Sequence, residues 1–143
     1  MAGIDIRITV TGLDEIQRSY ASSPALVKEA RLGFLRKSRN LVLRNVRANI
    51  PVRRTRLQAP VKSNRKWYRP GTTRRSVRSR LSTAQGRTTI FSRWFVARFL
   101  ERGTRKMSAQ QPFERAARAS QGDIQRFANE MAVEIARKLE RPA

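Results

Sequence analysis

The stretch RRSVRSRLSTAQGRTTIFS, residues 74–92, decides the fold class because it predicts a sheet. Its first part, RRSVRSRLS at 74–82, alternates arginines with apolar or small residues, and this period of two is typical of a strand with one arginine-bearing face. The residues AQG at 84–86 favour a turn, and RTTIFS at 87–92 is rich in the β-branched and aromatic residues that favour strands. The stretch therefore predicts a β-hairpin.

Three further elements are expected upstream of the hairpin. Residues 1–10, MAGIDIRITV, alternate isoleucine or valine with polar residues and predict a strand with one apolar face. A short helix is expected at 13–22. A long helix is expected from Pro24 to about Asn49, because proline suits the first helical turn and apolar residues then recur at helical spacing. Pro51 ends that helix, since the residue before a proline avoids the helical conformation.

The rest of the chain completes the predicted domain. Residues 51–73 are rich in proline and arginine and predict a long basic loop, mobile until assembly, because such long loops are usually functional or disordered. RWFVARFLERG at 93–103 predicts a short helix closed by its glycine, and apolar residues from Ile124 to Leu139 recur on one face of a final helix. The order predicts one α+β domain over residues 1–143, with a small antiparallel β-sheet packed against a long N-terminal helix and a C-terminal helix.

Charge is concentrated in one part of the sequence. The chain has a net charge of +22, with 32 Lys+Arg against 10 Asp+Glu. Between Arg31 and Arg98 there are 20 basic residues and no acidic residue, whereas the remaining 75 residues carry a net charge of only +2. A field of this kind favours a polyanion or a strongly acidic protein surface as partner. Arginine outnumbers lysine, which suits bidentate contacts to phosphates or carboxylates.

Cysteine and histidine are both absent from the chain. Their absence excludes disulfides, thiolate metal sites and the commonest general base near neutral pH. The acidic residues are scattered and form no convincing catalytic or metal-binding pair, so we expect no enzyme activity and no cofactor. No apolar run approaches the roughly 18 residues of a membrane span, and residues 1–10 lack the features of a signal peptide. A soluble protein with no membrane partner and no export signal is expected.

A second stretch, FLERGTRKMSAQQPFERAARAS at 99–120, is not typical of a linker. It contains Glu-Arg-Gly-Thr at 101–104 and Ala-Gln-Gln-Pro-Phe at 109–113, followed by a pair of alanines. Locally, Gly103 is explained as the end of one helix and Pro112 as the start of the next. The residues between them form the spacer.

With VTGLDEI (10–16), IPV (50–52) and PGTTRRSV (70–77), these segments resemble, in the same order, the tail-completion or head-to-tail joining family of tailed bacteriophages. The resemblance spans nearly the whole chain. It departs from the family pattern at Ile16 and Thr73, where leucine is usual, and at one extra residue before the Pro-Phe pair.

The resemblance implies a structural virion protein of the phage neck, assembled in the host cytoplasm, without catalysis. Such a protein joins the capsid connector to the tail as part of an oligomeric ring, most often six-fold, around the DNA channel. The implied partners are further copies of the chain, connector or portal-side proteins, tail tube or terminator proteins, and packaged double-stranded DNA. Candidate contacts to DNA phosphates or to acidic protein surfaces are Arg53, Arg54, Arg56, Lys62, Arg65, Lys66, Arg69, Arg74, Arg75, Arg78 and Arg80. Candidate subunit-interface residues are Thr104, Met107, Gln110 and Phe113.

Two alternatives stay open at the level of sequence. Either the loop at 104–111 packs against a neighbouring subunit, or the stretch serves only to anchor the final helix in the core through Phe113. The second alternative is a basic RNA- or DNA-binding protein outside a virion, of ribosomal or nucleoid type. The size of the chain, its arginine content and its pI near 12 all fit such a protein. The ordered motifs and the confinement of charge to one block favour the neck protein over this alternative.

Overall fold

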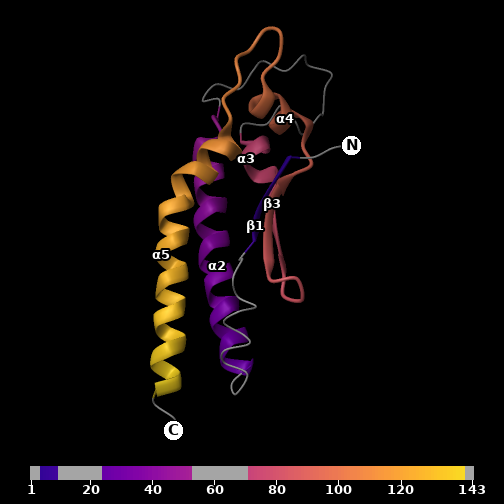
Figure 1. Cartoon of the computed structure of the whole chain (residues 1–143). Coiled ribbons are helices and arrows are strands. Elements are labelled where there is room, and N and C mark those ends of the chain that lie inside the picture. The colour runs from indigo at the N-terminus through magenta and orange to yellow at the C-terminus, as the bar shows by residue number, and fades with distance from the viewer. Residues whose placement is uncertain (1–3, 10–23, 53–70, 141–143) are drawn as a thin grey trace.

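The computed structural model describes residues 4–9, 24–52 and 71–140. The predicted short helix at 13–22 and all but the ends of the predicted loop at 51–73 lie outside the described residues. Within them, the chain forms, in order, β1 (Ile4–Thr9), α2 (Pro24–Asn49), α3 (Thr72–Ser76), β2 (Val77–Ser82), β3 (Arg87–Ser92), α4 (Phe95–Arg102) and α5 (Pro112–Glu140) (Figure 1).

The three strands form an antiparallel sheet in the order β1-β3-β2. The register places Ile90 between Ile6 on one neighbouring strand and Ser79 on the other. Because successive side chains of a strand point to opposite faces, these three residues share one face of the sheet and their sequence neighbours share the other. The predicted α+β fold, with a small antiparallel sheet and two long helices, is confirmed.

The hairpin begins later than the alternation of residues suggests. The prediction that its first strand covers 74–82 is wrong at the start, because residues 74–76 belong to α3 and β2 begins at Val77. Gly71 precedes this short helix with φ 77°, a conformation that glycine adopts at little cost. The backbone N–H of Arg75 then donates to the carbonyl oxygen of Gly71 at 2.9 Å. This local hydrogen bonding favours one helical turn over an extended strand.

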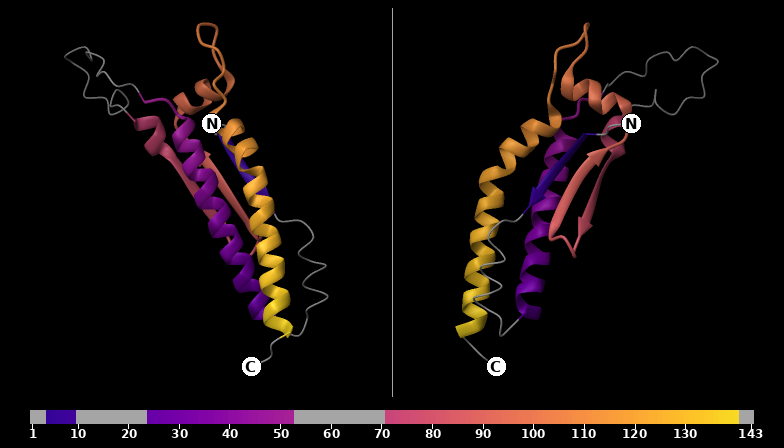
Figure 2. Two further views of the ribbon diagram at one scale, coloured as in Figure 1. Left: turned by 90° about the vertical axis from the view of Figure 1, so that its left-hand side faces the viewer. Right: turned by 45° about the vertical axis from the view of Figure 1, so that its right-hand side comes forward.

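The two long helices cover one face of the sheet. α2 and α5 run antiparallel and side by side, and α2 lies between α5 and the β2–β3 hairpin (Figure 2). As predicted, α2 begins at Pro24 and ends at Asn49, shortly before Pro51. The helix pair also brings the end of α2 next to the start of α5, where α4 lies (Figure 1).

The core consists of two apolar clusters. The larger lies where the C-terminal half of α2 meets the sheet, α4 and the start of α5, and it contains Val42, Val46, Ile50, Val77, Ile90, Ala97, Leu100, Phe113 and Ala116. The smaller lies between the opposite ends of α2 and α5 and contains Val27, Phe34, Leu35, Met131 and Ile135. Full burial of one large apolar side chain contributes about 1.5–3 kcal/mol, so both clusters stabilise the packing of the helices.

A buried polar contact fixes the register between the two long helices. The side-chain amide of Asn45 on α2 donates to Ser120 Oγ on α5 at 2.8 Å, and Ser120 is fully buried. Sliding one helix along the other would leave these groups without a partner, which costs about 1–3 kcal/mol for a buried polar group. The contact therefore holds α5 in one position against α2.

Candidate functional site

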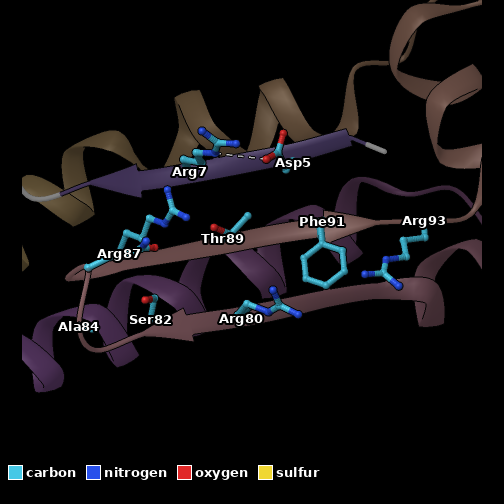
Figure 3. A pocket seen from close by; sticks show the side chains of 10 residues that line it. Asp5, Arg7, Arg80, Ser82, Ala84, Arg87, Thr89, Phe91 and Arg93 are labelled. Carbon is cyan, nitrogen blue, oxygen red and sulfur yellow. Dashed lines mark ion pairs between the residues drawn. The ribbon is translucent and has the colours of Figure 1, made fainter. Parts of the chain in front are cut away.

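The face of the sheet that points away from α2 and α5 is rich in arginine. On this outward face, cross-strand pairing places Arg7, Thr89 and Arg80 in one row and Asp5, Phe91 and Arg78 in the next. Figure 3 shows side chains of this face from all three strands, on the side of the sheet opposite the helices. The same alternation that buries Ile90 and Val77 thus exposes a set of charged side chains.

The outward face is hollowed on both sides of Phe91. One hollow of about 560 Å³ is lined by residues of all three strands, including Arg7, Arg80 and Arg87 (Figure 3). A second hollow of about 540 Å³ adjoins Phe91 on the side of Arg78 and Trp94. Both are open and bordered by guanidinium groups, so they suit anionic groups of a large partner better than an enclosed small molecule.

Few of the arginines on this face are neutralised. Arg7 Nε lies 3.3 Å from Asp5 Oδ2, and both side chains are exposed. The Arg93 guanidinium lies over the Phe91 ring, 5.9 Å from its centroid. Within the described part of the chain, no carboxylate forms an ion pair with the other arginines of the face, which are Arg78, Arg80 and Arg87. The outward face therefore carries a concentrated positive charge that attracts polyanions.

The structure separates the predicted contact residues into distinct groups. Arg78 and Arg80 are exposed on the outward face, which confirms their predicted orientation on one side of a strand. Arg74 is half-buried in α3, and its Nη2 donates to the carbonyl oxygen of Ile50 at 2.9 Å. Arg75 is exposed on α3. The remaining predicted contacts lie outside the described residues: Arg53, Arg54, Arg56, Lys62, Arg65, Lys66 and Arg69.

Three arginines of the outward face were not among the predicted contacts, namely Arg7, Arg87 and Arg93. Arg7 and Arg87 both lie in segments that the sequence predicts as strands, but the alternation of residues indicates the outward position only for Arg7. What the sequence lacks is the pairing of the strands, which brings these residues beside Arg80. Arg93 follows the last residue of β3 and had no such signal.

A tight joint links α4 to α5 next to the larger core cluster. Gly103 ends α4 with φ 75° and ψ 179°, a conformation that only glycine adopts readily. A Cβ atom at this position would lie 2.9 Å from the backbone nitrogen of Ala109 and from the carbonyl oxygen of Met107. The backbone N–H of Gln110 then donates a hydrogen bond to the carbonyl oxygen of Leu100 at 2.8 Å, so the end of the loop lies against α4.

Glu101 caps the start of α5 across this joint. Its two carboxylate oxygens accept hydrogen bonds from the backbone N–H groups of Phe113 and Glu114, both at 3.0 Å. The first N–H groups of a helix have no partner within the helix, and a carboxylate there also complements the helix dipole. This role of Glu101 was not predicted, because the cap and the helix start are far apart in the sequence.

The predicted subunit-interface residues do not share one environment. Thr104 and Gln110 are exposed on the loop between α4 and α5, whereas Met107 is half-buried against the larger core cluster. Phe113 is 1% exposed and lies inside that cluster. The structure therefore places Phe113 as a core anchor for α5, and of these four residues Thr104 and Gln110 are exposed.

Aromatic side chains of α4 border the joint and the outward face. Phe95 and Phe99 are 48% and 44% exposed, and their rings meet edge to face with centroids 5.8 Å apart. The Trp94 ring lies 5.2 Å from that of Phe95. Trp94 also lines the second hollow, so an apolar rim adjoins the basic face.

Searches for a metal site, for a membrane span and for relatives give negative results. No group of three or more Asp or Glu residues in the described segments is placed to hold a metal ion. Among the helices that the structure describes, none is both long and apolar enough to cross a membrane. Comparison of the chain with protein-family models, curated proteins and solved structures finds no match.

Proposed function

We propose that this chain is a non-catalytic structural component of a tailed-phage neck. In this role it joins the capsid connector to the tail, as one subunit of an oligomeric ring around the DNA channel. The proposal starts from the ordered sequence motifs described above. Its structural support is the way in which three of the motif segments meet in space.

The described parts of the motif segments, residues 50–52, 71–77 and 101–113, converge at one end of the molecule (Figure 1). Arg74 of the second segment donates to the carbonyl oxygen of Ile50 in the first at 2.9 Å. Ile50 and Phe113, from the first and third segments, lie in the same core cluster. Three segments that are distant in the sequence, and that carry the family resemblance, therefore form a single junction. Their contact supports a shared structural role.

The same end of the molecule offers a surface for assembly. The loop at 104–111 projects from the junction of α4 and α5 (Figure 1). Its ends are held by Gly103 and by the backbone contact of Gln110, while the side chains of Thr104 and Gln110 are exposed. A loop with fixed ends loses little conformational entropy on binding, and this pre-organisation favours contacts between subunits.

Co-expression with the products of the neighbouring genes tests the proposal. We expect the chain to co-purify with a connector or tail protein, and electron microscopy to show rings of defined copy number, most often six. The variant Gln110→Arg changes an exposed loop residue, and Gln121→Arg makes the same change on exposed α5. Loss of rings with the first variant but not the second supports assembly through the loop. Absence of rings and of any co-purifying virion protein contradicts the proposal.

The outward face of the sheet favours a second candidate, a basic nucleic-acid-binding protein outside a virion. The surplus of arginines on this face suits the binding of nucleic acid outside a virion as well as inside a phage neck. The genes that flank the coding sequence distinguish the two candidates. Capsid and tail genes support the neck protein, whereas ribosomal or chromosomal genes support the second candidate.

A further inference from the structure

We propose that the outward face of the sheet binds the phosphate backbone of duplex DNA without reading its sequence, through Arg7, Arg78, Arg80, Arg87 and Arg93. The choice of DNA as the nucleic acid rests on the proposed function, in which DNA passes through the ring. The binding face itself rests on the geometry and chemistry of the sheet.

The arginines are arranged over the full width of the sheet. Neighbouring strands lie about 4.8 Å apart, so Arg7 and Arg80, which flank Thr89 from the two outer strands, emerge roughly 10 Å apart. Arg78 and Arg80 are separated along β2 by about 7 Å. A spread of this size allows the guanidinium groups to contact several phosphates of one duplex at once, and each such contact releases a condensed counterion.

The polar composition of the face favours nucleic acid over an acidic protein. Besides its arginines, the face presents Ser82 and Thr89, whose hydroxyls suit phosphate oxygens, and Asp5, which pairs with Arg7. Its large apolar residues are Phe91 and, at the edge, Trp94. Stable protein interfaces concentrate apolar and aromatic residues at their centre and exclude charge from it. Protein–DNA interfaces are instead polar and strongly positive, as this face is.

The position of Phe91 favours a duplex over a single strand. Proteins that bind single strands stack the bases on exposed aromatic rings. The Phe91 ring is only partly exposed, and the Arg93 guanidinium lies over it at 5.9 Å from the centroid. The ring therefore orients an arginine, and the bases of a duplex stay paired while its phosphates meet the guanidinium groups.

Binding of the purified chain to a short duplex DNA of arbitrary sequence, measured by fluorescence anisotropy over a salt series, tests the inference. The five arginines of the face are expected to contribute about −4.5 to the slope of log affinity against log salt, which corresponds to a roughly 500-fold loss between about 50 and about 200 mM salt. Two unrelated sequences are expected to bind equally. The variant Arg78→Gln/Arg80→Gln is expected to make the slope shallower by about 2.

The matched control is Arg36→Gln/Arg44→Gln, which removes two exposed arginines from α2. It lowers the net charge by the same amount but leaves the sheet face intact. We expect its slope to stay close to that of the unmodified chain, with both variants folded by circular dichroism. Equal losses in the two variants would show that overall charge, not this face, attracts DNA, and would overturn the inference.

Competing ligands provide the other outcomes that overturn it. Absence of binding at low salt, or tighter arginine-dependent binding to polyglutamate than to DNA, would indicate an acidic protein as the partner of this face. Tighter binding to a single strand would overturn the assignment to a duplex, and tighter binding to an RNA duplex would overturn the assignment to DNA.

The inference and the proposed function can fail separately. Rings that assemble with neighbouring virion proteins, from a chain that binds no DNA, would refute the binding face alone. DNA binding that depends on Arg78 and Arg80, in a chain that forms no rings with those proteins, would refute the neck assignment alone.

Discussion

The joint between α4 and α5 and the outward face of the sheet use charged residues in opposite ways. At the joint, the carboxylate of Glu101 accepts hydrogen bonds from two backbone N–H groups at the start of α5. Nearby, the guanidinium of Arg74 donates a hydrogen bond to the carbonyl oxygen of Ile50. On the outward face, Arg78 and Arg80 project toward solvent without a carboxylate partner among the described residues. Charge therefore stabilises the fold in the first region, whereas in the second it stays exposed to solvent.

Charged residues that count equally in the composition thus have different structural roles at the joint and on the outward face. Removing a charge from the joint leaves a backbone group without its partner, which costs free energy of folding. Removing one from the outward face breaks no such contact and reduces repulsion among like charges. Substitutions at the joint should consequently destabilise the protein, whereas one on the outward face should leave its stability nearly unchanged. Three pairs of variants test the joint, and a fourth compares the two regions.

The largest loss of stability is expected from Phe113→Ala at the joint. Phe113 is fully enclosed by the larger core cluster, and truncation of a buried phenylalanine costs about 3–5 kcal/mol. The control is Phe99→Ala, which should reduce the free energy of unfolding much less because Phe99 is 44% exposed. Urea denaturation followed by circular dichroism measures both. A loss at Phe99 equal to that at Phe113 would contradict the assignment of Phe113 to the core.

Gly103→Ala comes next, with an expected loss of about 2–3 kcal/mol. The substitution forces an alanine into positive φ and brings its Cβ to 2.9 Å from two backbone atoms. Gly122→Ala is the matched control, because Gly122 lies inside α5 with open space around it. Alanine there should stabilise the protein by about 0.5–1 kcal/mol. Thermal unfolding of the two variants should therefore shift in opposite directions, and shifts of the same sign would refute the geometry of the joint.

Glu101→Ala should cost about 1 kcal/mol, the usual value for loss of a helix cap. The N–H groups of Phe113 and Glu114 would then lack their carboxylate partner. The control is Glu114→Ala, whose ion pair with Arg118 lies on the surface and contributes less than about 1 kcal/mol. Hydrogen exchange at the first turn of α5 should accelerate in the Glu101 variant. Unchanged exchange there would show that another group caps the helix.

The smallest effects on stability are expected from substitutions of Arg74 in α3 and Arg80 in the neighbouring strand β2. Arg74→Met removes the donor to Ile50 and should cost about 1 kcal/mol of stability. Arg80→Met removes an exposed side chain and should change stability by less than about 0.5 kcal/mol. Its effect should instead appear in DNA binding, as a salt slope shallower by about 1. If the two variants were equally destabilised, the distinction between the two regions would be lost.

Much of the fold follows from local sequence patterns. The alternation of residues predicted β1 and the first strand of the hairpin, and β-branched and aromatic residues predicted its second strand. Helical spacing with Pro24 and Pro51 predicted the bounds of α2. These patterns succeed because each reports the local backbone conformation together with one buried face. Alternation also predicted that Arg78 and Arg80 share an exposed face.

Other features depend on contacts between distant residues and could not be predicted locally. The helical turn of α3, where a strand was expected, adjoins the contact between Arg74 and Ile50. The capping role of Glu101 arises because the loop brings the end of α4 to the start of α5. Phe113, one of the candidate interface residues, lies in the core because α2 and the sheet close over it.

The sequence by itself determined which residues of each strand and helix point together, since that depends only on the periodicity of the backbone. It also determined the excess of arginine, from which we expect an anionic partner. Only the tertiary structure decided which arginines of the described residues are exposed. Strand pairing places Arg7, Arg80 and Arg87 around one hollow, whereas the helical turn of α3 brings Arg74 to the carbonyl oxygen of Ile50. The physical reason is that burial of a polar group costs free energy, which a hydrogen bond within the chain offsets, whereas water solvates a polar group on an uncovered face.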